Sequence, residues 1–116
     1  AQLVNEKLLN DDLSVLGKTC LLEMVNLFAQ ACINNMAAIE LARQHEDWVK
    51  LSDLAHNFKN AAGSLGLETL YQLVNQLESQ TKHGQPTSID LILEDLPELV
   101  KVSQKALNNW SAAHIA

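Results

Sequence analysis

Proline, glycine and aromatic residues are scarce in this sequence of 116 residues. It holds two Pro, four Gly, two Trp, one Tyr and two Phe. So few turn-forming residues favour long helices over many short strands. With few aromatic side chains available, the core has to be built from Leu, Val, Ile and Ala. The composition therefore predicts an all-α protein that is long enough for a single core but not for two.

Positive charge is also scarce. Lys and Arg total 8 against 14 Asp and Glu, which gives a net charge of −6. A domain with this charge lacks the basic surface that nucleic-acid binding needs, and an anionic membrane surface would repel it. The sequence contains neither an apolar run of about 20 residues nor a signal-peptide pattern. We therefore expect no nucleic-acid partner and no direct membrane contact.

Metal-binding and nucleotide-binding motifs are missing as well. Cys20 and Cys32 fall on one predicted helix, about 18 Å apart along its axis, so they cannot form a disulfide within it. We expect both to be reduced, which suits the cytoplasm. His45, His83 and His114 do not stand at ligand spacing with the cysteines, so no metal site is expected. No glycine-rich phosphate loop occurs, and we expect no ATP binding and no kinase activity of the chain's own.

Apolar residues three and four apart predict a series of amphipathic helices. The expected helices span residues 18 or 19 to 43, 47 to 65, 67 to 82, 89 to 95 and 97 to 113. Asp47 and Ser88 are suitable N-caps, and residues 82–87 form the clearest loop. Pro97 is expected to begin a new helix, because proline disrupts a helix interior but suits the first turn.

The N-terminal residues predict two short helical pieces, which Asn10 and Asp11 separate and Gly17 ends. Long amphipathic helices with short connections typically form an antiparallel up-down-up-down four-helix bundle. We therefore expect one domain over residues 1–116, in which residues 1–17 form a helical cap on a bundle of residues 18–113. Such a bundle buries its own apolar stripes, so a monomer is expected.

The predicted helix at 47–65 has two distinct faces at about 100° per residue. Its apolar face carries Leu51, Leu54, Ala55, Phe58, Ala61, Ala62 and Leu65. The opposite face carries Ser52, His56, Lys59, Asn60 and Gly63. The helix therefore presents one imidazole to solvent, and a neutral imidazole nitrogen is a nucleophile near pH 7. A glycine inside a helix costs roughly 1 kcal/mol relative to Ala, which suggests that bare backbone beside His56 lets another protein approach closely.

The pattern H-x-x-K-x-x-x-G, made by His56, Lys59 and Gly63 and followed by Leu65-Gly66-Leu67, resembles histidine-containing phosphotransfer (HPt) domains. The approach to this motif and the later Leu77-Glu78 pair are also similar. The resemblance covers roughly residues 15 to 110 and is most specific over 47–78. The motif looks most like the C-terminal HPt domains of Arc- or Tor-type hybrid sensor kinases.

The resemblance implies a phosphorelay carrier with the four-helix fold. His56 would accept a phosphoryl group from a receiver-domain aspartate and pass it to a response-regulator aspartate, while Lys59 would stabilise the charge on the phosphoryl oxygens. Ser52, Asn60, Gly63 and Glu78 would belong to the docking surface. Asn60 departs from the family, which most often has Gly at this position. The resemblance also implies that the partner receivers supply Mg²⁺, and that this domain needs no cofactor.

Two other functions stay open from the sequence. The first is a structural or adaptor bundle without phosphotransfer, in which Glu78 would be an ordinary exposed side chain. The second is a histidine-kinase dimerisation domain, which also displays a His but normally needs a partner chain and an attached ATP-binding domain. The first residue is not Met, which leaves open that the chain is a piece of a longer protein, such as the cytoplasmic part of a membrane-bound sensor kinase.

Overall fold

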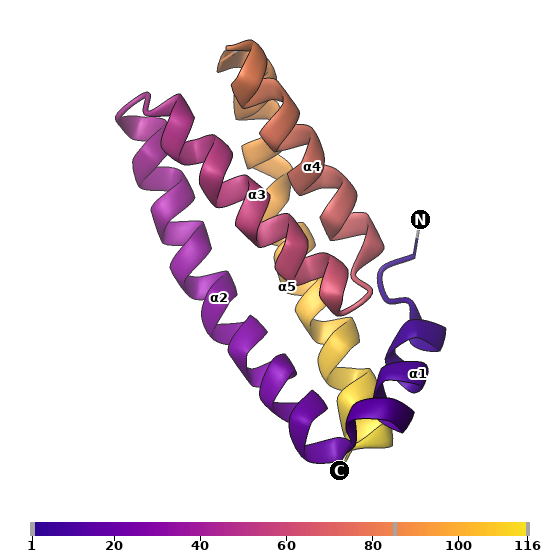
Figure 1. Cartoon of the computed structure of the whole chain (residues 1–116). Helices are drawn as coiled ribbons and strands as arrows, with labels where there is room; N and C mark the ends of the chain where they lie inside the picture. Colours follow the sequence, from indigo (N-terminus) through magenta and orange to yellow (C-terminus); the bar gives the residue numbers. More distant parts are fainter. Residues whose placement is uncertain (1, 85, 116) are drawn as a thin grey trace.

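The computed structural model describes residues 2–84 and 86–115, and every element in it is a helix. The helices are α1 (Glu6–Leu16), α2 (Lys18–Gln44), α3 (Trp48–Ser64), α4 (Glu68–His83) and α5 (Pro86–His114) (Figure 1). The described residues contain no strand, so the prediction of an all-α protein is confirmed. Within the same residues, no helix is both long enough and apolar enough to cross a membrane.

The four long helices pack in a ring. Helix α3 packs on α2 and on α4, and α5 closes the ring by packing on both α4 and α2. Helix α1 contacts α2 and lies across the end where α5 finishes (Figure 1). The centre of the ring is apolar, and Phe58 is completely buried there, stacked on Phe28 with the ring centroids 6.0 Å apart. The predicted core face of α3 is thus confirmed at Phe58.

The predicted break at Asn10 and Asp11 is wrong, because α1 runs through both residues. The helix begins after Asn5, whose side chain accepts a hydrogen bond from the Leu8 N–H at 3.1 Å. Asn10 is tolerated inside the helix because its Oδ1 accepts the indole N–H of Trp110, at 3.2 Å, from the far end of the chain. The predicted end at Gly17 is confirmed, and this glycine has a φ of 84°.

The predicted break at Pro97 is also wrong, since α5 is continuous across it and begins at Pro86, before Ser88. The apolar stripe explains this continuity, because it keeps the helical period on both sides of the proline. Its buried members are Ile89, Ile92, Leu96, Val100, Leu107 and Trp110. A proline inside a helix costs about 3 kcal/mol. Burying even two such side chains stabilises the helix by a similar amount.

The remaining boundaries follow the predictions to within one or two residues. Asp47 caps α3 by accepting the Lys50 N–H at 3.1 Å, and Gly84 ends α4 in the left-handed conformation. The predicted loop at 82–87 is too long, because α4 runs to His83 and α5 already begins at Pro86, so Ser88 lies inside α5 and not at its N-cap. Residue 85 lies outside the described residues. The N-terminal segment runs beside the connection from α3 to α4, where the Asn5 N–H donates to the Gly66 carbonyl at 2.8 Å.

Both cysteines are free, as expected, but their surroundings differ. Cys20 is exposed near the start of α2, whereas Cys32 is buried in the core. Burial raises the pKa of the Cys32 thiol to about 12. Cys32 is therefore protonated at neutral pH and behaves as a small core side chain.

Candidate functional site

The candidate site is centred on His56, in the middle of α3. The His56 side chain is 55% exposed, while Ala55 and Phe58 beside it in the sequence are completely buried. Asn60, one turn further along, is exposed as well, and Ser52, one turn earlier, is partly exposed. The helix therefore holds the imidazole at the surface on a rigid, well-packed base.

A carboxylate lies beneath this imidazole. Glu78 of α4 places its Oε2 atom 3.0 Å from His56 Nδ1, although the residue is only 6% exposed. Glu78 stands one turn after Val74, at the edge of the apolar stripe of α4, and this register turns it toward α3. The alternative of an exposed Glu78 is wrong. A side chain so well covered also offers little surface to a docking partner.

Two lysines compensate the buried charge of Glu78. Lys59 Nζ lies 2.7 Å from Glu78 Oε1 and donates a hydrogen bond to Asn75 Oδ1 at 2.9 Å. Lys82 Nζ lies 3.5 Å from Glu78 Oε2. The hydrogen bond from Lys59 lowers the pKa of the Glu78 carboxyl, against the effect of burial, and the bond from His56 adds to this. The same contact raises the pKa of Lys59. Glu78 is therefore ionised at neutral pH.

The ionised carboxylate fixes the tautomer of a neutral His56. A carboxylate can only accept hydrogen bonds, so His56 Nδ1 must be the protonated nitrogen that donates to it. The other nitrogen, Nε2, then carries the lone pair. Among the described residues, the polar atom recorded in contact with Nε2 is the side-chain amide nitrogen of Asn60, at 3.4 Å. The site thus presents a nucleophilic nitrogen at the surface, with a negative charge behind the ring.

Gly63 has a different neighbourhood from that of Asn60. It is partly buried against α4, and a Cβ atom built on it would lie 3.1 Å from Cδ2 of the Tyr71 ring. The same ring lies under the Lys59 ammonium, with Nζ 5.9 Å from the ring centroid. The space that a side chain at position 63 would fill is thus taken by a residue of this chain. The glycine allows α3 and α4 to approach closely at this point.

Sequence reasoning overlooked three members of the site on α4, namely Tyr71, Asn75 and Lys82. Together with Glu78 they follow spacings of four, three and four, which is the period of one helical face. This polar stripe runs directly beside the leucine stripe of the same helix. The sequence therefore contains this polar stripe, but only the packing of α4 against α3 shows that the stripe lies beside His56.

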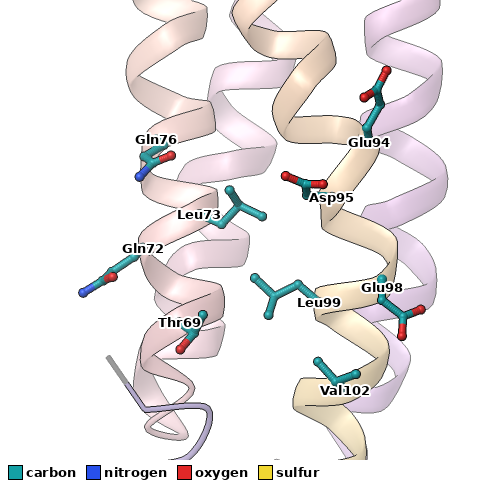
Figure 2. A pocket seen from close by; sticks show the side chains of 9 residues that line it. All are labelled: Thr69, Gln72, Leu73, Gln76, Glu94, Asp95, Glu98, Leu99 and Val102. Atoms are coloured by element: carbon teal, nitrogen blue, oxygen red, sulfur yellow. The ribbon is translucent and has the colours of Figure 1, made fainter.

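Apart from this site, a hollow lies on the other edge of α4, between α4 and α5. Its volume is about 500 Å³, and it is lined by Thr69, Gln72, Leu73, Gln76, Glu94, Asp95, Glu98, Leu99 and Val102 (Figure 2). In Figure 2, Leu73 and Leu99 face each other across the gap between α4 and α5. The hollow holds carboxylates but no His, Cys or Lys. Across the described residues, no group of three or more side chains is arranged to hold a metal ion.

Comparison with known proteins identifies the family. The model of the Hpt domain family matches residues 23–109. The chain belongs to the Hpt domain family. It is 32% identical over 102 residues to the Sensor protein TorS of Escherichia coli (strain K12), and this match covers 88% of the chain and 10% of the relative. The Hpt domain thus spans about a tenth of the length of this curated relative. No solved structure matches it significantly.

Family membership gives the Hpt domain its general role. Hpt domains act as phosphocarriers in the phosphorelays of two-component signal transduction, and in hybrid kinases they interact with receiver domains. The sequence-based identification of the family is therefore confirmed. His56 and Lys59 of the motif come together with Glu78 in one cluster, which the His56–Glu78 hydrogen bond and the Lys59–Glu78 ion pair hold in place.

Proposed function

We propose that His56 accepts a phosphoryl group from the aspartate of a receiver domain and passes it to the aspartate of a response regulator. The observation that carries the proposal is the contact between Glu78 Oε2 and His56 Nδ1 at 3.0 Å. It leaves the lone pair on Nε2, the nitrogen that an incoming phosphorus can reach from solvent. Family membership supports the same role.

In the forward step, the Nε2 lone pair attacks the phosphorus in line with the bond to the aspartyl oxygen. The N–P bond forms as the O–P bond breaks, and the aspartyl oxygen keeps the electron pair and leaves as a carboxylate. His56 keeps its Nδ1 proton, so the phosphorylated ring carries a positive charge that faces Glu78. In the onward step, the second receiver's carboxylate attacks, the N–P bond breaks, and Nε2 recovers its lone pair.

Glu78 contributes to both steps through charge and orientation. Its carboxylate stabilises the positive charge that develops on the ring, as preorganised charges do in catalytic sites. Lys59 holds this carboxylate toward His56, because its ammonium lies 2.7 Å from Oε1. We further propose that Lys59 adds positive charge near the phosphoryl oxygens during transfer. Mg²⁺ would come from the receivers, as the family resemblance implies.

The receiver would dock on the exposed face of α3, over Ser52, His56 and Asn60. Gly63 would lie at the edge of this face. Because it has no side chain and Tyr71 packs against it, nothing would project there toward the receiver.

We propose that the four long helices form the antiparallel up-down-up-down bundle, which their ring of contacts supports. We also propose that this bundle and its N-terminal cap are one monomeric domain that works in the cytoplasm.

The other functions account less well for the site. A structural bundle gains nothing from a buried carboxylate aimed at an exposed imidazole, because burying a charge is costly unless it is paired. A histidine-kinase dimerisation domain would leave apolar stripes for a partner chain to cover. Here the inward-facing stripes of the long helices pack on one another, and Phe58, Leu70 and Leu107 are each at most 1% exposed. Single apolar side chains such as Leu27 and Ile33 remain exposed on the outer face of α2.

The test is phosphoryl uptake from a receiver domain charged with acetyl phosphate and Mg²⁺. We expect acid-labile, alkali-stable label on the Hpt domain, lying on His56 Nε2 by NMR. The His56→Gln variant should keep its fold and lose all label, whereas His83→Gln, a change at another exposed histidine, should behave as wild type. Label that persists on His56→Gln would overturn the proposed function.

A further inference from the structure

Asn60 lies beside the acceptor nitrogen of His56, at the exposed surface of α3. It follows His56 by four residues on α3, so the two side chains lie on the same face. Its Nδ2 atom is 3.4 Å from His56 Nε2. Since Nε2 carries a lone pair in this tautomer, the amide must turn its NH₂ end, and not its oxygen, toward the ring.

The hydrogen bond from Asn60 to Nε2 is long and therefore weak. Ordinary N–H donors lie about 2.9–3.0 Å from their acceptors. An incoming phosphorus can displace such a contact at little cost. Once the phosphoryl group is on Nε2, its oxygens extend outward into the space beside the amide. The NH₂ group then faces strong anionic acceptors in place of one weakly held lone pair.

Lys59 does not fill this place in the free domain. Its ammonium is held between Glu78 and Asn75, on the Nδ1 side of the ring, and its side chain is only 15% exposed. Among the described residues, Asn60 is the side chain that contacts Nε2. The donor closest to the future phosphoryl group is therefore a neutral amide at a position where the family most often has glycine.

We propose that Asn60 is a phosphoryl-binding residue, whose side-chain amide donates a hydrogen bond to the phosphoryl group on His56 and prolongs the life of the phosphohistidine. This inference rests on the proposed function. Its physical basis is the movement of the phosphoryl group during hydrolysis. Water attacks the phosphorus, the N–P bond breaks with its electron pair returning to Nε2, and inorganic phosphate leaves. In the loose transition state the N–P bond is largely broken, so the phosphoryl group has moved away from Nε2 and from the amide beside it. A donor at this place consequently stabilises the starting phosphohistidine more than the transition state.

The test uses phosphoramidate, which needs no receiver. It transfers its phosphoryl group to Nε2 and releases ammonia, and the excess reagent is then removed. The half-life of phospho-His56 is followed by ³¹P NMR in wild type, Asn60→Ala, Asn60→Asp and Asn57→Ala. The last variant is the matched control, because Asn57 is also exposed on α3 but lies about 100° around the helix from His56.

We expect Asn60→Ala to shorten the half-life by about threefold to tenfold, as the loss of one hydrogen bond of ordinary net strength would. Asn60→Asp should shorten it further, since a carboxylate cannot donate and repels the phosphoryl group. Asn57→Ala should leave it unchanged. Equal half-lives in wild type and Asn60→Ala would overturn this inference and leave the proposed function standing. This holds even if Asn60→Ala accepts the phosphoryl group from a receiver at a different rate than wild type does. Absence of any label on wild-type His56 would overturn the proposed function and this inference with it.

Discussion

Two ion pairs join different helices of this domain and share little beyond their chemistry. Arg43 of α2 donates from Nη2 to Asp90 Oδ2 of α5 at 2.9 Å, while its guanidinium lies over the Trp48 ring, 5.3 Å from the centroid. Lys59 of α3 meets Glu78 of α4 at 2.7 Å. The Asp90 side chain is 51% exposed, whereas the Glu78 side chain is 8% exposed.

Burial is the difference that makes the Lys59–Glu78 pair part of a site. Asp90 is paired with Arg43 and is otherwise exposed to solvent, and this bond holds the end of α2 against the start of α5. Glu78 has little solvent and contacts Lys59, Lys82 and His56 together. Because less water surrounds Glu78, its charge acts on the imidazole with less screening than the charge of Asp90 has. The exposed Arg43–Asp90 pair only joins two helices, whereas the buried Lys59–Glu78 pair also contacts the imidazole of His56.

Truncating the buried carboxylate should have the largest effect. Glu78→Ala removes the acceptor of His56 Nδ1 and leaves Lys59 without its main partner. We expect phosphoryl transfer from a charged receiver to fall about 100-fold, the scale of losing one preorganised electrostatic contact in a catalytic site. Single-turnover transfer rates measure this. A variant that transfers at the wild-type rate would show that Glu78 does not act on the ring.

Displacing the Tyr71 ring, which lies next to the buried Lys59–Glu78 pair, should have an intermediate effect, on the stability of the fold. Gly63→Leu forces the Tyr71 ring, which lies under Lys59, to move. From helix propensity alone, Leu would stabilise α3 by roughly 0.8 kcal/mol. The contact with Tyr71 reverses this expectation, and overpacking typically costs about 1–3 kcal/mol. Urea unfolding should therefore give a lower stability for Gly63→Leu than for wild type. A more stable variant would mean that Tyr71 swings freely away.

The pH dependence of stability should distinguish Glu78 from a neutral side chain. The pKa of Glu78 is lowered in the folded state from its ordinary value of 4.5 by the hydrogen bond from Lys59. The stabilisation it provides is therefore complete above that value and is lost as the pH falls toward the folded pKa. The difference in unfolding free energy between wild type and Glu78→Gln should be constant near neutral pH and narrow below pH 4.5. Urea titrations from pH 7 to pH 3 measure it. A gap that widens in acid would contradict the lowered pKa.

Neutralising the exposed pair should have the smallest effect, and it is the control for the other changes. Asp90→Asn removes the charge opposite Arg43 without touching α3 or α4. Exposed ion pairs contribute little to stability, so we expect a slight fall in the melting temperature and an unchanged transfer rate. A transfer defect in this variant as large as that of Glu78→Ala would mean that burial does not separate the two pairs.

The sequence was sufficient for the parts of the molecule that depend on local patterns. Helical periodicity predicted the positions of α2, α3 and α4 and the burial of Phe58, while the motif singled out His56. The breaks at Asn10 and Pro97 were wrong because distant packing overrode local preference, through Trp110 in the first case and the continuous apolar stripe in the second. The partner of His56 Nδ1 could not be predicted, because it depends on the rotation of α4 against α3.

The cluster around Glu78 also has a consequence at long range. Two lysines and one glutamate leave one positive charge beside His56, in a chain whose net charge is −6. A phosphorylated aspartate approaching from solution therefore meets a small attractive region on a domain of net negative charge. Such a field guides the orientation of an encounter before any contact forms, and salt weakens it over about 10 Å at 0.1 M ionic strength. The exposed Lys82 extends this field furthest from the helices, so it would influence how quickly a receiver finds His56 rather than how tightly it binds.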